Sequence, residues 1–357
     1  MRDYYFDTEL DLGSSGVANY SLDDLRDLCS LDLSGIDRLV LSDGKSLGDD
    51  AVRQALADRF TGGDAGRVMT TSGSSEAMFL TMSSLLAAGD EVVVVEPVYQ
   101  QLVAIARSLG CQIVPWPLRA CSFDADIGQL ASLVTGRTSM IVVNFPHNPT
   151  GTTITRSEQQ ELVRIAARAG AYLVWDAAFE DITYGSDPLP HPDREYERAI
   201  TFGTFSKSYG LPGLRFGWCL AAPEILDSYI RIRDYVTLHL SVLVEFVAQR
   251  VLTHADALIA DRRALATRNL GILASWLPER ADLSWTPPRG GVSAAIRVEA
   301  ADDVEELCRR VAEVHRVLVV PGTVFGPPLR RHIRLGFGTE TPDLLQGLDR
   351  LAKALDS

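Results

Sequence analysis

The sequence predicts an α/β protein with a large domain, built on a mostly parallel sheet covered by helices, and a smaller α+β domain. Short β-branched runs alternate with longer helical stretches from about residue 67 to residue 220. Such alternation is typical of a mainly parallel sheet with helices on both faces. The chain has 357 residues, more than a typical single domain, so two domains are expected. After Pro223 the alternation gives way to a mostly helical stretch and then to mixed strands and helices.

The alternating part contains four strand–helix units followed by three more strands. We expect strands at 67–70, 92–95, 111–116 and 140–143, and helices from 74 onward and at 98–109, 127–133 and 156–169. The apolar run 171–175 ends at Asp176, and further strands are expected at 199–202 and 216–220. Polar motifs fall at the ends of these strands. Because ligands of open α/β sheets bind at the carboxyl ends of the strands, we expect the functional site there.

The last part of the chain has a different pattern. Residues 223–276 are expected to be mostly helical. Strands are then expected at 294–298, 317–320 and 333–337, and helices at 303–315 and 342–355. This mixture indicates the α+β domain.

Composition excludes several classes of protein. The net charge of −13 argues against a nucleic-acid surface, and the apolar run 91–96 is far too short to span a membrane. The five cysteines have no Cys-x-x-Cys spacing, which indicates buried thiols in a reducing compartment and neither a disulfide framework nor a metal site. The first residues carry acids where a signal peptide would be apolar. We therefore expect a cytoplasmic protein.

Lys207 lies in the most informative motif, Ser206-Lys207-Ser208, eight residues before Arg215. A lysine amine condenses with an aldehyde only when it is neutral, and its ordinary pKa is about 10.4. A site that uses the amine must therefore lower that pKa by burial or by a nearby cation. Arg215 is the candidate cation, and its guanidinium also suits a phosphate. An aldehyde that carries a phosphate indicates pyridoxal 5'-phosphate (PLP).

The remaining motifs decide whether Lys207 is more than a solvated surface lysine. Along the chain they are Gly73-Ser74-Ser75, Asn148-Pro149-Thr150-Gly151, Asp176, Lys207, Arg215 and Arg334. Taken singly, each has a structural explanation, such as a helix cap or a turn. In this order they resemble the fold-type I, class I/II aminotransferase family over nearly the whole chain. The resemblance implies PLP as cofactor and a homodimer with its sites at the subunit interface.

The resemblance also implies a role for each motif. Ser74 and Ser75 begin a helix whose free N–H groups favour an anion, and with Thr204, Ser206 and Arg215 they would hold the phosphate. Asp176 would pair with the pyridine nitrogen and keep the ring cationic. Asn148 would donate to the ring's phenolate oxygen and also contact the substrate, and Tyr99 would lie over the face of the ring. Arg334 would bind the substrate carboxylate, and Ser15 and Gly16 would belong to an N-terminal loop that approaches the substrate. The family arrangement divides the chain into a large domain, 45–255, and a small domain, 1–44 with 256–357.

The chain departs from the family pattern at two places. Phe179 stands where the family usually has a tyrosine that bonds the phenolate oxygen, which puts plain transamination in doubt. The stretch 41–48 contains no aromatic residue, although a tyrosine there usually reaches the partner subunit's phosphate.

Longer strings, among them residues 12–20, 142–151, 174–179, 203–213 and 233–237, resemble the family's cyclases of antibiotic pathways. That likeness implies conversion of 3-hydroxy-L-arginine to the cyclic amino acid capreomycidine, by loss of water and addition of a guanidine nitrogen. An aminotransferase, an arginine oxidase and a non-catalytic regulator remain alternatives. The acid that binds the cationic side chain stays open among Glu9, Asp11 and Glu180, as does the group that protonates the leaving hydroxyl.

Overall fold

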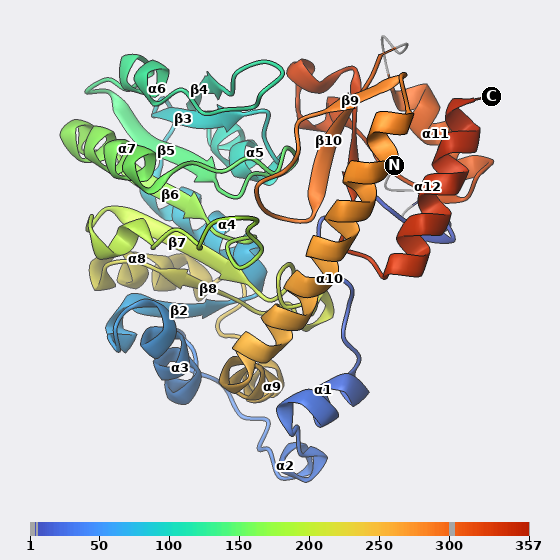
Figure 1. Ribbon diagram of the computed structural model, residues 1–357. Coiled ribbons are helices and arrows are strands. Elements are labelled where there is room, and N and C mark those ends of the chain that lie inside the picture. The colour runs from blue at the N-terminus through green and yellow to red at the C-terminus, as the bar shows by residue number, and fades with distance from the viewer. Residues whose placement is uncertain (1–3, 5, 300–303, 357) are drawn as a thin grey trace.

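A central seven-stranded sheet organises the larger part of the molecule (Figure 1). The computed structural model describes all residues except 1–3, 5, 300–303 and 357. The strand order is β2-β8-β7-β6-β5-β3-β4. Strand β8 runs antiparallel to both neighbours, β7 and β2, and the other pairs are parallel. The bounds are β2 Val68–Thr71, β3 Glu91–Glu96, β4 Gln112–Pro117, β5 Thr138–Asn144, β6 Tyr172–Asp176, β7 Ala199–Thr204 and β8 Gly217–Leu220. The predicted mostly parallel sheet is confirmed.

Helices cover both faces of this sheet because its strands are apolar on both sides. Along β3, Val92 and Val94 pack into one core and Val93 and Val95 into another. The first core takes side chains from α4 Gly73–Leu85, α5 Gln101–Ser108 and α8 Pro223–Arg233, and the second from α6 Ile127–Leu133 and α7 Arg156–Ala169. This alternation is the two-sided burial that a parallel sheet requires.

The strand order reverses between β3 and β5, which neighbour each other although β4 lies between them in the chain. Successive units extend the sheet in opposite directions from this point, so their connections leave a crevice at the carboxyl ends of the strands. Asn144 ends β5 and Asp176 ends β6 in adjacent register. The crevice therefore starts with two polar side chains side by side.

The smaller part of the molecule is built on two further sheets. One has the order β12-β13-β10-β9, from β9 Leu283–Trp285, β10 Ser293–Val298, β12 Val320–Pro321 and β13 His332–Gly336. The other pairs β1 Leu10–Asp11 with β11 Val317–Leu318 in parallel, so the N-terminal segment joins this part of the fold. Helices α11 Glu305–Glu313 and α12 Thr341–Leu355 pack beside it.

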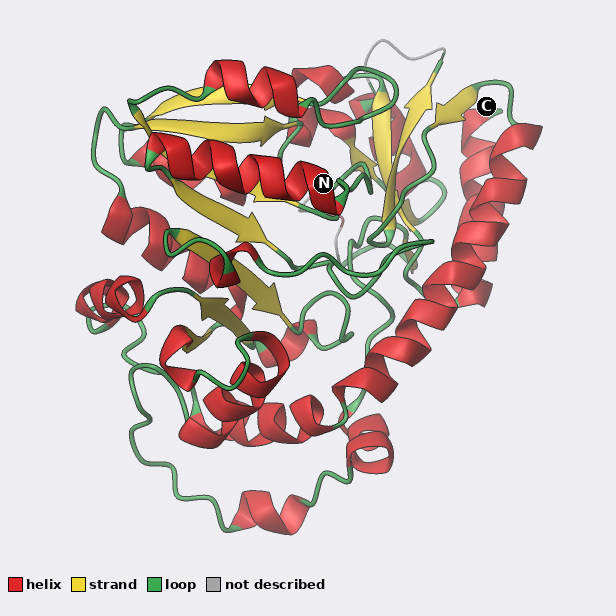
Figure 2. Ribbon diagram, turned by 60° about the vertical axis from the view of Figure 1, so that its left-hand side comes forward, coloured by secondary structure: helices red, strands yellow, loops and turns green. Residues whose placement is uncertain are grey.

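Helix α10, Ala255–Trp276, connects the two parts (Figures 1 and 2). Its first turns share a core with α1 Leu22–Cys29, α3 Asp50–Phe60 and α9 Val242–Thr253, whereas its last turns pack into the core of the smaller part. The short α2, Leu33–Asp37, follows α1. We keep the division into 45–255 and 1–44 with 256–357 as a proposal. In the part of the chain that the structure describes, no helix is long and apolar enough to cross a membrane.

Candidate active site

A cavity of about 310 Å³ lies at the carboxyl ends of the central strands. It gathers residues from the N-terminal loop, the large sheet and β13. Its lining comprises Gly13, Ser14, Ser15, Ser74, Ser75, Tyr99, Gln101, Asn144, Asn148, Asp176, Ala178, Phe179, Thr204, Ser206, Lys207, Arg215 and Arg334. Of the site residues expected from the sequence, Gly16 alone is not in this lining. Gly16 instead packs against the backbone of Ser206, where a Cβ would lie 3.1 Å from the carbonyl oxygen.

Lys207 is half-buried in the wall of this cavity, and its Nζ donates a hydrogen bond of 2.8 Å to Ser15 Oγ. Burial lowers the pKa of Lys207 to about 8, with the Arg334 cation as the next contributor and Arg215 behind it; Asp176 acts in the opposite direction. The sequence suggested Arg215 as the main cation, but Arg334 from the smaller part of the fold has the larger effect. The lowered pKa makes the neutral amine accessible near neutral pH.

Asp176 is buried at the end of β6. Its Oδ1 accepts the Ala178 N–H at 3.0 Å. Burial raises its pKa to about 6, against the lowering influence of that N–H and of Lys207. A cation placed beside this carboxylate would favour its ionised form, since an opposite charge lowers the pKa of an acid.

The N-terminus of α4 and the segments on both sides of Lys207 form a polar cup. Arg215 Nη1 donates to Ser206 Oγ at 3.2 Å, and Thr204 Oγ1 accepts the Ser206 N–H at 3.1 Å. The guanidinium lies so close to Gly73 that a Cβ there would be 2.7 Å from Arg215 Nη2. Gly73 also has a φ of +70°, which disfavours any side chain. The absence of a side chain at Gly73 thus lets the arginine approach the helix N-terminus.

Behind this cup lies a buried ion pair. The Glu76 carboxylate in the first turn of α4 accepts the Ser72 N–H at 2.5 Å. Its Oε1 lies 3.1 Å from Arg233 Nε and also accepts from Thr237 Oγ1. Arg233 is fully buried and donates to the Ser46 carbonyl at 2.6 Å. A carboxylate near the helix N-terminus is thereby neutralised by a cation.

Arg334 projects from β13 to the opposite side of the cavity. Its Nη1 donates to Asn148 Oδ1 at 3.1 Å and its Nη2 to the Gly13 carbonyl. Since Asn148 uses its oxygen for Arg334, its side-chain amide N–H groups are left for another partner. Arg334 therefore ties the smaller part of the fold to the Asn-Pro-Thr-Gly turn and to the N-terminal loop.

Asn144 and Gln101 are two of the lining residues that the sequence interpretation did not single out. Asn144 Nδ2 donates to the Asp176 carbonyl at 2.9 Å, and its Oδ1 accepts the Asn148 N–H at 2.8 Å. Asn144 ends a strand next to Asp176, so its position at the strand end could have identified it as a site residue. Gln101 accepts from Ser75 Oγ at 3.1 Å, and no sequence signal distinguished it. Tyr99 lies in the loop before α5 and is 43 % exposed.

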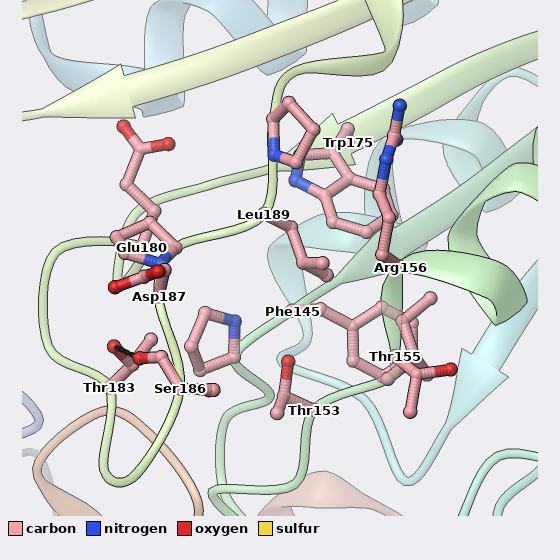
Figure 3. Close-up of a pocket in the computed structure, with 14 residues that line it drawn as sticks. Phe145, Thr153, Thr155, Arg156, Trp175, Glu180, Thr183, Ser186, Asp187 and Leu189 are labelled. Carbon is pink, nitrogen blue, oxygen red and sulfur yellow. Dashed lines mark hydrogen bonds between the residues drawn. The ribbon is translucent and has the colours of Figure 1, made fainter.

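The three acids considered for a cationic side chain are placed elsewhere. Glu9 pairs with Arg350 at 2.9 Å, and Asp11 Oδ1 accepts the Gly13 and Ser14 N–H groups. Glu180 bonds the buried His191 and lines a separate cavity of about 510 Å³ with Trp175 and Leu189 (Figure 3). Among the described residues that line the first cavity, Asp176 is the one carboxylate.

The cysteines lie away from the Lys207 cavity in the described part of the chain. No group of three or more His, Cys, Asp or Glu side chains is placed there to hold a metal ion. Cys29, Cys219 and Cys308 are buried as the sequence suggested, whereas Cys111 is half-buried and Cys121 is exposed. None of these cysteines lines the Lys207 cavity.

Comparison with known proteins identifies the class of protein that this fold and site define. Residues 35–351 match the family Aminotransferase class I and II. The chain is 43% identical to capreomycidine synthase of Streptomyces vinaceus, over 99% of this chain and 92% of that protein. The chain belongs to the class I and II aminotransferase family.

Individual structures and relatives refine this result. The crystal structure of the PLP-dependent cyclase OrfR superposes with a TM-score of 0.93 at 42% identity, covering 99% of this chain and 96% of that one. Arginine–pyruvate transaminase of Pseudomonas aeruginosa is 26% identical over 85% of this chain and 80% of that protein. The aspartate aminotransferase of Thermus thermophilus, at 23% identity and a TM-score of 0.87, shares the fold over 98% of this chain and 92% of that one.

Proposed function

We propose that this protein is a PLP-dependent cyclase that converts (2S,3S)-3-hydroxyarginine to capreomycidine by loss of water and intramolecular guanidine addition. The observation that carries the proposal is the 43% identity to capreomycidine synthase along 99% of the chain. The half-buried Lys207, whose pKa is lowered to about 8, supplies the amine that such a reaction needs in the cavity. We further propose a role in antibiotic biosynthesis and a cytoplasmic location.

The cavity fits PLP by the chemistry of its donors. The close approach of Arg215 to Gly73 leaves a guanidinium, two hydroxyl side chains and a helix N-terminus around one point, which suits a phosphate. Lys207 would hold the aldehyde of PLP, and Asp176 would pair with its ring nitrogen. When bound, PLP supplies an electron sink that makes the substrate α-proton acidic.

The side chains of the cavity then divide the remaining work. The neutral Lys207 amine takes the α-proton at Nζ, and later returns a proton to the α-carbon. Arg334 fixes the substrate carboxylate through its planar fork. Between these two events the hydroxyl departs from the β-carbon as water, and a guanidine nitrogen forms the new bond there while losing one proton.

The site is proposed to be completed in a homodimer. The cavity lining contains one carboxylate among the described residues, Asp176, which is assigned to the cofactor. The cationic substrate side chain therefore needs an acid from outside this lining. A subunit interface at the mouth of the cavity is consistent with this requirement, and it fits the family to which the chain belongs.

The competing function is that of an aminotransferase, favoured by the 26% identity to arginine–pyruvate transaminase. The test is incubation of the holoenzyme with 3-hydroxyarginine alone and, separately, with arginine and pyruvate, followed by mass analysis. The cyclase forms a product one water lighter than 3-hydroxyarginine without any keto acid. Rapid pyruvate-dependent loss of arginine, with no water-loss product from 3-hydroxyarginine, would move the assignment to the aminotransferase.

A further inference from the structure

Ser15 is in direct contact with the proposed base. Its Oγ accepts a hydrogen bond of 2.8 Å from Lys207 Nζ, and the residue is 6% exposed. Backbone hydrogen bonds hold the loop that follows Ser15 to both parts of the fold. The Val17 N–H donates to the Lys207 carbonyl at 3.4 Å, and the Ala18 N–H donates to the Gly338 carbonyl at 2.7 Å. The serine hydroxyl is thus held beside the amine by a loop bonded to both parts of the fold.

The other hydroxyl groups around the cavity have different partners. Thr204 and Ser206 bond one another and, through Ser206, Arg215. Ser75 Oγ donates to Gln101 and Ser14 Oγ accepts the Gly16 N–H. In the described part of the chain, Ser15 is the residue whose hydroxyl lies within hydrogen-bond distance of Lys207 Nζ. Because a hydroxyl has one hydrogen and two lone pairs, Ser15 can accept from Lys207 and still donate into the cavity.

We propose that Ser15 is the proton relay that protonates the leaving β-hydroxyl, carrying to it the proton that Lys207 has taken from the α-carbon. This proposal rests on the cyclase function proposed above. Lys207 Nζ takes the α-proton, and the electron pair of the broken C–H bond goes on to form the Cα–Cβ double bond as the Cβ–O bond breaks. The departing oxygen takes the proton of Ser15 Oγ while Ser15 takes one from Lys207 Nζ. Water leaves, and both side chains end neutral.

The proposed reaction requires a group in the cavity that gives a proton to the leaving hydroxyl. Hydroxide is a poor leaving group, so the β-oxygen needs a proton as its bond breaks. Asp176, the one carboxylate in the described lining, is assigned to the cofactor nitrogen. Lys207 is a suitable source of the proton because its lowered pKa of about 8 makes its protonated form a stronger acid than an ordinary lysine.

The experiment compares two reactions of holoenzyme variants in D₂O. Exchange of the α-proton of arginine, which has no β-hydroxyl, reports on proton removal by Lys207 without the relay. Release of water from 3-hydroxyarginine reports on Lys207 and the relay together. In Ser15→Ala we expect arginine exchange within about threefold of the wild type and water release reduced by about 10²-fold, the usual contribution of a general acid.

Two controls separate the relay from a structural role. Ser208→Ala removes a buried hydroxyl that follows Lys207 in the chain but does not line the cavity, and water release should change little. If Ser15→Ala does not fold, the isosteric pair Ser15→Thr and Ser15→Val differs only in the hydroxyl, and Thr alone should retain water release.

Each other outcome counts against the proposal. Equal losses of exchange and water release in Ser15→Ala would mean that Ser15 only positions Lys207, and unchanged water release would also exclude the relay. Equal water release by the Thr and Val variants would do the same. A wild-type enzyme that exchanges arginine but releases no water from 3-hydroxyarginine would refute the proposed function itself, and the relay with it.

Discussion

Burial of the Lys207 amine lowers its pKa to about 8, and this value sets the pH at which the apoprotein captures PLP. Below pH 8 the neutral fraction of the amine falls about tenfold for each pH unit. The rate of covalent capture should therefore rise between pH 6.5 and pH 8 and level off above it. Stopped-flow absorbance of the yellow product measures this rate. A rate that still rose steeply beyond pH 9 would indicate an ordinary lysine.

The assignment of Lys207 as the lysine that binds PLP has a simple control, because the chain contains two other lysines, Lys45 and Lys353. Both side chains are exposed, at 64% and 66%, and neither lines the Lys207 cavity. After borohydride treatment of the holoenzyme, peptide mapping should find the cofactor on Lys207. Its recovery on Lys45 or Lys353 would contradict the site.

Asp176 is predicted to keep the cofactor ring protonated. Asp176→Asn keeps an oxygen for the Ala178 N–H, which Asp176 now bonds at 3.0 Å, but it removes the charge. The loss of one preorganised charge at such a site costs on the order of 10²-fold in rate. We expect PLP to remain bound by absorbance while α-proton exchange of arginine falls by about that factor. Exchange near the wild-type rate would refute the role.

Arg334 is predicted to bind the substrate carboxylate. Arg334→Lys keeps the positive charge but loses the planar fork. A hydrogen bond to a charged group contributes ~1.5–3 kcal/mol, so arginine should bind about tenfold more weakly or worse. Spectral titration with agmatine, the decarboxylated form of arginine, is the control. Equal weakening of arginine and agmatine would exclude a carboxylate clamp.

At the scale of elements, the N-terminus of α4 depends on the Glu76–Arg233 pair behind it. Arg233→Met leaves a buried carboxylate without its cation, 2.5 Å from the Ser72 N–H. Removing one partner of a buried pair typically costs ~3–5 kcal/mol of stability, and the negative charge should also repel the phosphate. We expect lower thermal stability and at least tenfold weaker PLP binding by fluorescence titration.

A second variant tests whether charge is the cause. Adding Glu76→Gln to Arg233→Met removes the uncompensated charge and should recover part of the PLP affinity. Arg231→Met, on the same helix at an exposed position, is the matched control and should resemble the wild type. If the double variant binds PLP no better than Arg233→Met, packing and not charge explains the loss.

The elements differ in how far the sequence could define them. Helices α6 and α7 begin and end where their apolar periodicity does. Helix α5 begins at Gln101 and not at Val98; the segment before it contacts the smaller part of the fold, where the Val98 N–H donates to the Phe325 carbonyl. The run expected at 317–320 is two short strands with different partners, β1 and β13. Strand β9 has three residues and exists through its pairing with β10. In these cases a tertiary contact decides the local structure.

At the scale of the whole molecule, the candidate site was more predictable than its supporting contacts. Lys207, Asp176 and Arg334 come from distant parts of the chain, yet each stands in a recognisable motif at a strand or beside one. Their roles stay predictions. No sequence motif indicated which residues pair with the acids Glu180 and Glu76. Their partners, His191 and Arg233, are brought to them only when the chain folds. Pairing across the fold cannot be read from composition or periodicity.

The proposed homodimer makes a prediction about two loops near the cavity. Tyr235 is 90% exposed and Val236 is 54% exposed, and the neighbouring Thr237 bonds Glu76 at the N-terminus of α4. Val40 and Leu41 are also exposed, at 75% and 77%, on a loop that meets the first one where Gly44 lies against His239. Exposed apolar side chains gathered in this way are typical of an interaction surface.

Replacing Tyr235 and Val236 together by Asp should therefore separate the subunits. Charges are depleted from the cores of interfaces, where their desolvation is costly. By sedimentation, the wild type should have twice the mass of the 39.0 kDa chain, and the variant should shift to the single mass and bind PLP more weakly. Val314→Asp, at an apolar position that is 68% exposed in the smaller part of the fold, should leave the dimer intact. A wild-type monomer with full activity would overturn both the dimer and the idea that the partner completes the site.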